Sequence, residues 1–135
     1  MATARSVVTG FIDEVWDEGR LDRAAAYIAA EYDLGTLGRG PAASATNARV
    51  FREAFPDLSV RVTDVIEQGS RVAVWMQLSG TQAGDFRGHP ASNRHAVWDE
   101  VGFFTVDDGK IVAGRCLADM FGLRKALGII PAAMH

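Results

Sequence analysis

Two carboxyl groups and one arginine in the second half of the chain have side chains that could do acid/base chemistry. Glu100 lies within an apolar, strand-like segment, and Asp119 follows the last such segment. If both carboxylates face one pocket they repel each other and the pKa of one rises, an arrangement that suits acid/base catalysis. Arg115 lies four residues before Asp119, hence on the same face of a regular strand. It could bind an anionic oxygen of a substrate or hold Asp119 ionised, which would make the aspartate a weaker base.

Each of these residues also has an ordinary structural interpretation. Asp119 is well placed to cap a short helix that begins one or two residues later. Arg115 could face solvent at the edge of a sheet. Glu100 could lie on the solvated side of its strand, and Asp99 must then point to the other side. The residue types alone leave both sets of roles open.

Aromatic and polar residues on two strand-like segments could bind a flat ligand. Trp75 and Gln77 share one face of their segment, and Trp98 shares a face with Glu100. A face that combines an aromatic with a polar side chain is typical of a small-molecule pocket, so these are candidate substrate-binding residues. Each tryptophan, taken singly, is more typical of a hydrophobic core. His95 follows a long connection and could reach the mouth of the same pocket.

The composition excludes several classes of protein. The chain has 135 residues, a formal net charge of −3 and 48% hydrophobic residues, which fits a single globular domain over 1–135. The mildly acidic balance argues against nucleic acid as a partner. The single cysteine, Cys116, excludes an internal disulfide and is expected to be a buried, small hydrophobic residue. The three histidines lack the spacing of metal ligands, so no metal is expected.

The sequence shows no targeting or membrane signal. Four acidic residues lie within Phe11–Glu18, where a signal peptide would be apolar. No apolar run approaches the roughly 18 residues of a membrane span. We therefore expect a soluble, cytoplasmic protein with no membrane contact. The glycines of Gly35-x-x-Gly38-x-Gly40 do not follow a strand, which argues against a nucleotide site.

Apolar residues at helical spacing predict helices at both ends of the chain. The predicted helices are Val7–Trp16, Ala24–Ile28, Thr46–Phe55 and Phe121–Leu127. Gly19 and Gly128 are expected to end the first and the last of them. Asp22 is expected to cap the second helix. The segment 34–45, rich in glycine and small residues, is interpreted as a loop.

In the middle of the chain the apolar period changes to two, which predicts strands. They are expected over Leu58–Thr63, Val72–Ser79, Val97–Phe104 and from Ile111 onward. Turn residues at 68–70 and 107–110 predict antiparallel hairpins, and 83–94 is a longer connection. Helices followed by four antiparallel strands indicate an α+β fold. A curved sheet packed against the N-terminal helices forms a cone with a pocket inside, although the alternation does not say which faces point inward.

Several short motifs carry a family resemblance. They are Ala54-Phe55-Pro56-Asp57-Leu58, Val72-Ala73-Val74, Gly80-Thr81 with Gly84, Gly88-His89-Pro90, Asp108-Gly109-Lys110-Ile111, Asp119-Met120-Phe121-Gly122-Leu123 and Ala126-Leu127-Gly128. With these motifs the chain resembles the SnoaL-like polyketide cyclase family, within the NTF2-like (cystatin-like) superfamily of cone-shaped α+β barrels. The N-terminal helices fit the same pattern, so the resemblance covers nearly everything except 32–45.

The resemblance implies an enzyme that works without a cofactor. Members of this family close the last ring of an aromatic polyketide by intramolecular aldol condensation. An aspartate near the end of the last strand serves as the general acid/base, and the matching position here is Asp119. The resemblance further implies a hydrophobic, polyketide-like ligand in the cone pocket and a homodimer that pairs through the sheet face.

The chain also departs from the family pattern. Gln82 stands where the family usually has histidine, Arg115 where it usually has tryptophan, and Trp75 where it often has arginine. These positions are expected to contact the ligand, so isomerase, hydroxylase and a non-catalytic binding or dimerisation module remain alternatives. The charged residues that epoxide hydrolases of this fold carry are absent at Trp75, at Gln77 and near Cys116, which argues against that reaction.

Overall fold

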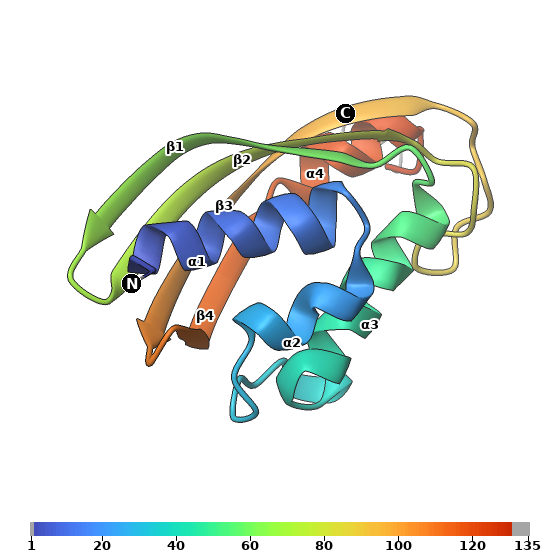
Figure 1. Cartoon of the computed structure of the whole chain (residues 1–135). Helices are drawn as coiled ribbons and strands as arrows, with labels where there is room; N and C mark the ends of the chain where they lie inside the picture. Colours follow the sequence, from blue (N-terminus) through green and yellow to red (C-terminus); the bar gives the residue numbers. More distant parts are fainter. Residues whose placement is uncertain (1, 131–135) are drawn as a thin grey trace.

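The structure, a computed structural model that describes residues 2–130, is an antiparallel sheet folded over helices from the first half of the chain. The strands are β1 (Ser59–Gln68), β2 (Arg71–Thr81), β3 (His95–Asp107) and β4 (Lys110–Ala118). They lie in the order β1-β2-β3-β4, each paired with its neighbour in sequence. Figure 1 shows the long strands arching over α1 (Ala4–Phe11). The predicted α+β fold with a curved antiparallel sheet is confirmed.

Tight turns and bulges shape the sheet. Gly69 and Gly109, the glycines of the two predicted hairpins, have φ values of 59° and 73°, which glycine adopts without strain. The β1–β2 pairing shifts after Val62, and the β3–β4 pairing shifts after Thr105. Bulges of this kind bend a strand and increase its twist, so they let the sheet curve around the helices.

The first helix is present as predicted but changes its winding halfway. It begins at Ala4 after the N-cap Thr3, whose hydroxyl accepts a hydrogen bond of 3.0 Å from the backbone N–H of Ser6. From Ile12 to Asp17 the chain continues as a π-helix. A π turn contains one residue more than an α turn, and such turns are frequent at functional sites. The regular apolar stripe in the sequence did not reveal this change.

The second helix is shorter than expected and lacks its predicted cap. Asp22 lies inside a 3₁₀ turn over Leu21–Arg23, and α2 (Ala24–Tyr27) follows that turn directly. No side chain caps the start of α2, so the prediction for Asp22 is wrong. A preceding turn already supplies the helical conformation, which leaves no extended residue to act as a cap.

The third helix begins earlier than predicted. α3 spans Gly40–Ala54, so the expected loop over 34–45 is helical in its second half. Pro41 lies in the first turn, where a missing N–H does no harm. The alanines that follow are strong helix formers, and they outweigh the glycine and proline content that suggested a loop.

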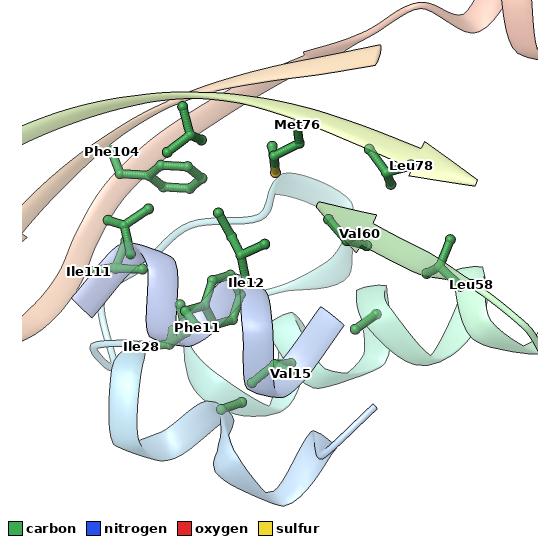
Figure 2. Packing of buried hydrophobic residues seen from close by; sticks show 14 of the residues in the cluster. Phe11, Ile12, Val15, Ile28, Leu58, Val60, Met76, Leu78, Phe104 and Ile111 are labelled. Carbon is green, nitrogen blue, oxygen red and sulfur yellow. The ribbon is translucent and has the colours of Figure 1, made fainter. Parts of the chain in front are cut away.

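The core lies between the inner face of the sheet and the helices. Every second residue of β2 is buried there, namely Val72, Val74, Met76 and Leu78. Figure 2 shows Met76 and Phe104 pointing from the sheet toward Ile12 of the π-helix. Burial of each large apolar side chain contributes roughly 1.5–3 kcal/mol, so this layer holds the sheet on the helices.

The last helix, α4 (Met120–Leu127), packs against β3. Asp119 accepts a hydrogen bond of 2.9 Å from the backbone N–H of Gly122, which confirms its predicted position as a cap. Leu123 and Leu127 are buried, and Gly128 ends the helix with a φ of 74°. The cap therefore lies at the point where β4 passes into α4.

Candidate functional site

A pocket lies between the inner face of the sheet and the helices. Its volume is about 330 Å³, which suits a small organic molecule. Its apolar lining includes Phe11, Ile12, Trp16, Leu34, Phe51, Val60, Met76, Leu78, Phe104 and Met120. Its polar lining consists of Tyr32, Ser44, Asn47, Arg87, Glu100 and Cys116. An apolar pocket with few polar groups is typical of a site for a hydrophobic ligand.

Aromatic side chains from two helices form one wall of this pocket. Trp16 belongs to the π-helix and packs edge-on against Phe51 of α3, with the ring centres 5.6 Å apart. The ring of Phe51 in turn lies 5.7 Å from that of Phe86. Edge-on contacts of this kind fix the orientation of both rings. The wall therefore offers a ligand ordered aromatic surface.

Two glycines on neighbouring strands make room for the ring of Phe104. A Cβ atom on Gly102 or on Gly114 would lie 2.6 Å from that ring, and one on Gly114 would also lie 3.0 Å from the Tyr32 hydroxyl. The ring therefore lies directly against strand backbone, where only glycine fits. These glycines were not among the predicted site residues, although a glycine inside a strand is a recognisable signal for close approach.

Among residues 2–130, Glu100 is the acidic residue that lines the pocket. Burial raises the pKa of Glu100 above its usual value, and Arg87 partly opposes this by lowering it. Burial raises the pKa of Tyr32 to about 12. At neutral pH the tyrosine therefore keeps its proton, whereas burial shifts Glu100 toward its protonated form.

Cys116 lies on the edge strand β4 and is exposed while it also lines the pocket. The expectation of a buried core residue is therefore wrong. β4 is the last strand of the sheet, so no further strand covers the free edge beside Cys116. The protein around the thiol still raises the pKa of Cys116 to about 12, mainly through desolvation. The cysteine is thus an accessible but protonated and weakly nucleophilic group.

Arg87 reaches the pocket from the connection between β2 and β3. Phe86 and His89 exchange two backbone hydrogen bonds of 2.9 Å, which closes a two-residue turn with Arg87 at φ 49° and Gly88 at φ 83°. The guanidinium carbon lies 5.2 Å from the ring centre of Phe86 and 6.0 Å from that of Phe51. Arg87 was not among the predicted site residues, because nothing in the neighbouring sequence connects a loop arginine with a distant pocket.

Gln82 holds the same connection in place. Its side chain is fully buried, and its amide nitrogen donates hydrogen bonds to the carbonyls of Gly84, His89 and Pro90 over 3.1–3.2 Å. Its side-chain oxygen accepts one of 3.2 Å from the N–H of Ser92. A buried amide with all these partners is a structural residue. At this position, where the family usually has histidine, the chain uses a side chain that orders the loop.

The two predicted carboxyl groups occupy different places. Glu100 lines the pocket, as its predicted role requires. Asp119 is exposed and bound to the start of α4, yet its neighbours Ala118 and Met120 both line the pocket. Ala118 pairs with Glu100 across the β3–β4 ladder. Asp119 therefore lies at the rim, directly after the end of β4 that pairs with Glu100.

Three predicted substrate-binding residues lie on the outer face of the sheet. Trp75 is 50% exposed there. The side-chain oxygen of Gln77 accepts a hydrogen bond of 3.0 Å from Arg61, and Arg115 pairs in register with the exposed Phe103. The predicted sharing of one face by Trp75 and Gln77 is correct, but that face points away from the pocket. Arg115 consequently does not face the carboxylate at the rim.

Two further candidates also lie outside the pocket lining. Trp98 is on the inner face but belongs to the core, with its ring 5.2 Å from that of Phe55. His95 is exposed at the start of β3, where its Nδ1 lies 3.2 Å from the Thr81 hydroxyl. The long connection that precedes His95 brings Arg87, rather than the histidine, to the pocket.

Between residues 2 and 130 no group of three or more His, Cys, Asp or Glu side chains could hold a metal ion. Over the same residues no helix is both long and apolar enough to cross a membrane.

Solved structures of other proteins share this fold. TsrD from Streptomyces laurentii matches with a TM-score of 0.84 at 24% identity, covering 93% of this chain and 98% of its own. A candidate SnoaL-like polyketide cyclase from Jannaschia sp. CCS1 matches with a TM-score of 0.82 at 26% identity, covering 95% and 93%. AclR, a candidate hydroxylase from Streptomyces galilaeus, matches with a TM-score of 0.80 at 20% identity, covering 95% and 97%. Among curated proteins no match was found.

A family model shows to which protein family this chain belongs. The model of the SnoaL-like polyketide cyclases matches residues 6–127. That range runs from α1 to the end of α4 and includes every element that lines the pocket. The chain therefore belongs to the SnoaL-like polyketide cyclase family.

Proposed function

We propose that this chain closes a ring in a polyketide-like molecule by intramolecular aldol chemistry, without a cofactor. The observation that carries the proposal is the cyclase family match over 6–127 in a chain whose pocket is mainly apolar. Such a pocket binds a hydrophobic molecule through shape and a few polar contacts. Isomerisation, hydroxylation and binding without turnover are the alternatives, and the experiment below separates the last two from ring closure by product mass.

The reaction needs a folded substrate and a positioned carboxyl group. A carbon between two carbonyls loses a proton readily, because the resulting enolate is delocalised. That carbon attacks a carbonyl of the same molecule, and the new alkoxide takes a proton back, so substrate and product have equal mass. Holding the flexible chain in an attacking conformation lowers the entropic part of the barrier. Positioned proton transfer adds on the order of 10²–10⁴-fold in rate.

Asp119 is the group that we propose to take and return the proton, as the family resemblance implies. Its place between the pocket-lining residues Ala118 and Met120 supports this role. Gly122 leaves room for the carboxylate, because a Cβ there would lie 2.2 Å from Asp119 Oδ2. Of the predicted substrate-binding residues, we retain Glu100 as a polar contact inside the pocket.

A turnover assay on the wild type and Asp119→Asn tests this proposal. Both proteins are incubated with a panel of polycyclic aromatic polyketide esters, and product mass is followed together with tryptophan quenching, for which Trp16 in the lining is a reporter. Asparagine caps a helix as well as aspartate does, so the variant is expected to fold. We expect a product of equal mass from the wild type and a loss of at least about 10²-fold in the variant.

The other outcomes distinguish the alternatives. A product heavier by one oxygen would indicate hydroxylation. Quenching without any product in either protein would indicate a binding module and reduce Asp119 to a helix cap. Unchanged turnover by Asp119→Asn would remove this residue from the mechanism while leaving the reaction in place.

We further propose that a second copy of the chain covers the outer face of the sheet. This face exposes large apolar side chains on several strands, with Ile66, Trp75, Phe103 and Leu117 each about half exposed or more. A contiguous apolar patch of this kind marks an interaction surface. The predicted homodimer through the sheet face would bury it, together with Arg115.

A further inference from the structure

Among residues 2–130, one positively charged and one negatively charged side chain line the pocket. They are Arg87 and Glu100, and in this part of the chain neither forms an ion pair. Nη1 of Arg87 donates a hydrogen bond of 3.8 Å to Met120 Sδ, and a thioether is a weak acceptor. A guanidinium has five N–H donors. Arg87 therefore has donors free for a ligand.

The backbone presents Arg87 at a conformational cost. Its φ of 49° lies in the left-handed region, and two-residue turns of this type favour Asn, Asp or Gly there. Strain of this kind persists where the surrounding structure enforces it, and it concentrates at ligand-binding sites. The buried ring of Phe86 and the hydrogen bonds of Gln82 supply that enforcement.

Aromatic rings fix the direction of the guanidinium. It lies over both Phe86 and Phe51, and such cation–π contacts hold an arginine without using its N–H donors. Phe51 also belongs to the pocket wall. A flat ligand against this wall would meet the edge of the guanidinium, where the donors lie.

We propose that Arg87 forms a subsite for an anionic oxygen, either a carboxylate or an enolate, carried by a flat apolar ligand. The inference rests on the proposed function and deepens it, because aldol closure places negative charge on an enolate oxygen before the new bond forms. The proton leaves the carbon for the catalytic carboxylate, and the electron pair moves onto the oxygen. A guanidinium can then stabilise that oxygen with one or two charge-assisted hydrogen bonds. Glu100, nearby, disfavours ligands with a second negative charge.

A binding experiment with two isosteric probes tests the subsite without turnover. Calorimetry compares 2-naphthoate with 2-naphthamide, which differ in charge but hardly in shape. The wild type is expected to prefer naphthoate by about tenfold, the lower range for a hydrogen bond to a charged group. Arg87→Met is expected to lose this preference and to bind naphthamide as before. Arg94→Met, a matched arginine on the same connection but outside the pocket lining, is expected to keep it.

A second variant separates binding from folding. Asparagine tolerates the left-handed conformation better than arginine, so Arg87→Asn is expected to lose the naphthoate preference with no fall in Tm. A lower Tm with an unchanged preference would overturn the inference, because Arg87 would then serve the fold. A wild type that binds both probes equally, or neither, would overturn it as well.

The two proposals can fail separately. If wild type and Arg87→Met close rings equally well and show the same probe preference, the subsite is wrong and the reaction stands. If the wild type prefers naphthoate but converts no polyketide ester, the proposed reaction is wrong and the anion subsite stands.

Discussion

The two faces of the sheet differ sharply although the same four strands build them. On β3, Phe104 points inward and is 5% exposed, while its neighbour Phe103 points outward and is 51% exposed. The inner face packs on the helices and surrounds a pocket that holds Glu100. The outer face carries an apolar patch and Arg115. Successive residues of one strand therefore serve two different surfaces, which we assign to ligand binding and to association.

This difference shows that strand periodicity does not determine which face of a sheet points to the pocket. Alternation places residues on a common face, and both predicted pairs do share one. Trp75 and Gln77 share the outer face, whereas Trp98 and Glu100 share the inner face. Which face is inside depends on the helices that cover it, and these belong to a distant part of the sequence. A candidate taken from alternation alone can thus point away from the site.

The largest expected effect comes from truncating one phenylalanine on each face. Phe104→Ala removes a ring buried against Gly102 and Gly114, and we expect a loss of about 3–5 kcal/mol in the free energy of unfolding. Phe103→Ala, on the exposed side, is expected to change it by less than about 0.5 kcal/mol in dilute solution. Urea denaturation of both variants measures the difference. Equal losses would contradict the division between the faces.

Local patterns predicted much of the fold. The hairpins follow from turn residues such as Gly69 and Gly109, and the cap of α4 follows from Asp119. These features depend on a few neighbouring residues. The early start of α3 at Gly40 was missed because glycine and alanine make opposing contributions within one short segment.

The pocket was harder to predict than the fold, for a different physical reason. Glu100 was the site candidate that the structure places in the lining. Arg87 and Tyr32 reach the same cavity from separate connections, and no periodicity relates their positions. Only the packing of the sheet on the helices brings them together. The glycines under Phe104 were the local signal that could have marked the inner face.

An intermediate effect is expected on association through the outer face. Phe103→Glu places a charge in the centre of the apolar patch, and desolvating an unpaired charge opposes pairing. We expect this variant to dissociate at least about tenfold more readily than the wild type, measured by analytical ultracentrifugation. Phe103→Tyr keeps the apolar ring and is the control. A wild type that is monomeric at every concentration would contradict the proposed dimer while leaving the pocket unaffected.

The smallest expected effect is a pH dependence confined to the inner face. Burial raises the pKa of Glu100 above its ordinary value of 4.5, so the native state binds this proton more tightly than the unfolded chain does. Stability contributed by Glu100 is therefore greatest below pH 4.5 and falls as the pH rises through the raised pKa. Of the groups that face it, Tyr32 and Cys116 have pKa values of about 12 and do not titrate in this range. The neighbouring guanidinium of Arg87 opposes the rise in the pKa of Glu100.

The pH dependence due to Glu100 can be measured by comparing variants of two neighbouring carboxyl groups on β3. Glu100→Gln removes the penalty, so its free energy of unfolding is expected to exceed that of the wild type at pH 7, with the advantage vanishing toward pH 4. Asp99→Asn, exposed on the outer face, is expected to leave the pH dependence unchanged. Arg87→Met removes the opposing charge and is expected to enlarge the wild-type penalty. Identical pH profiles for Glu100→Gln and Asp99→Asn would show that burial on the inner face does not control this proton, because these adjacent carboxylates lie on opposite sides of the sheet.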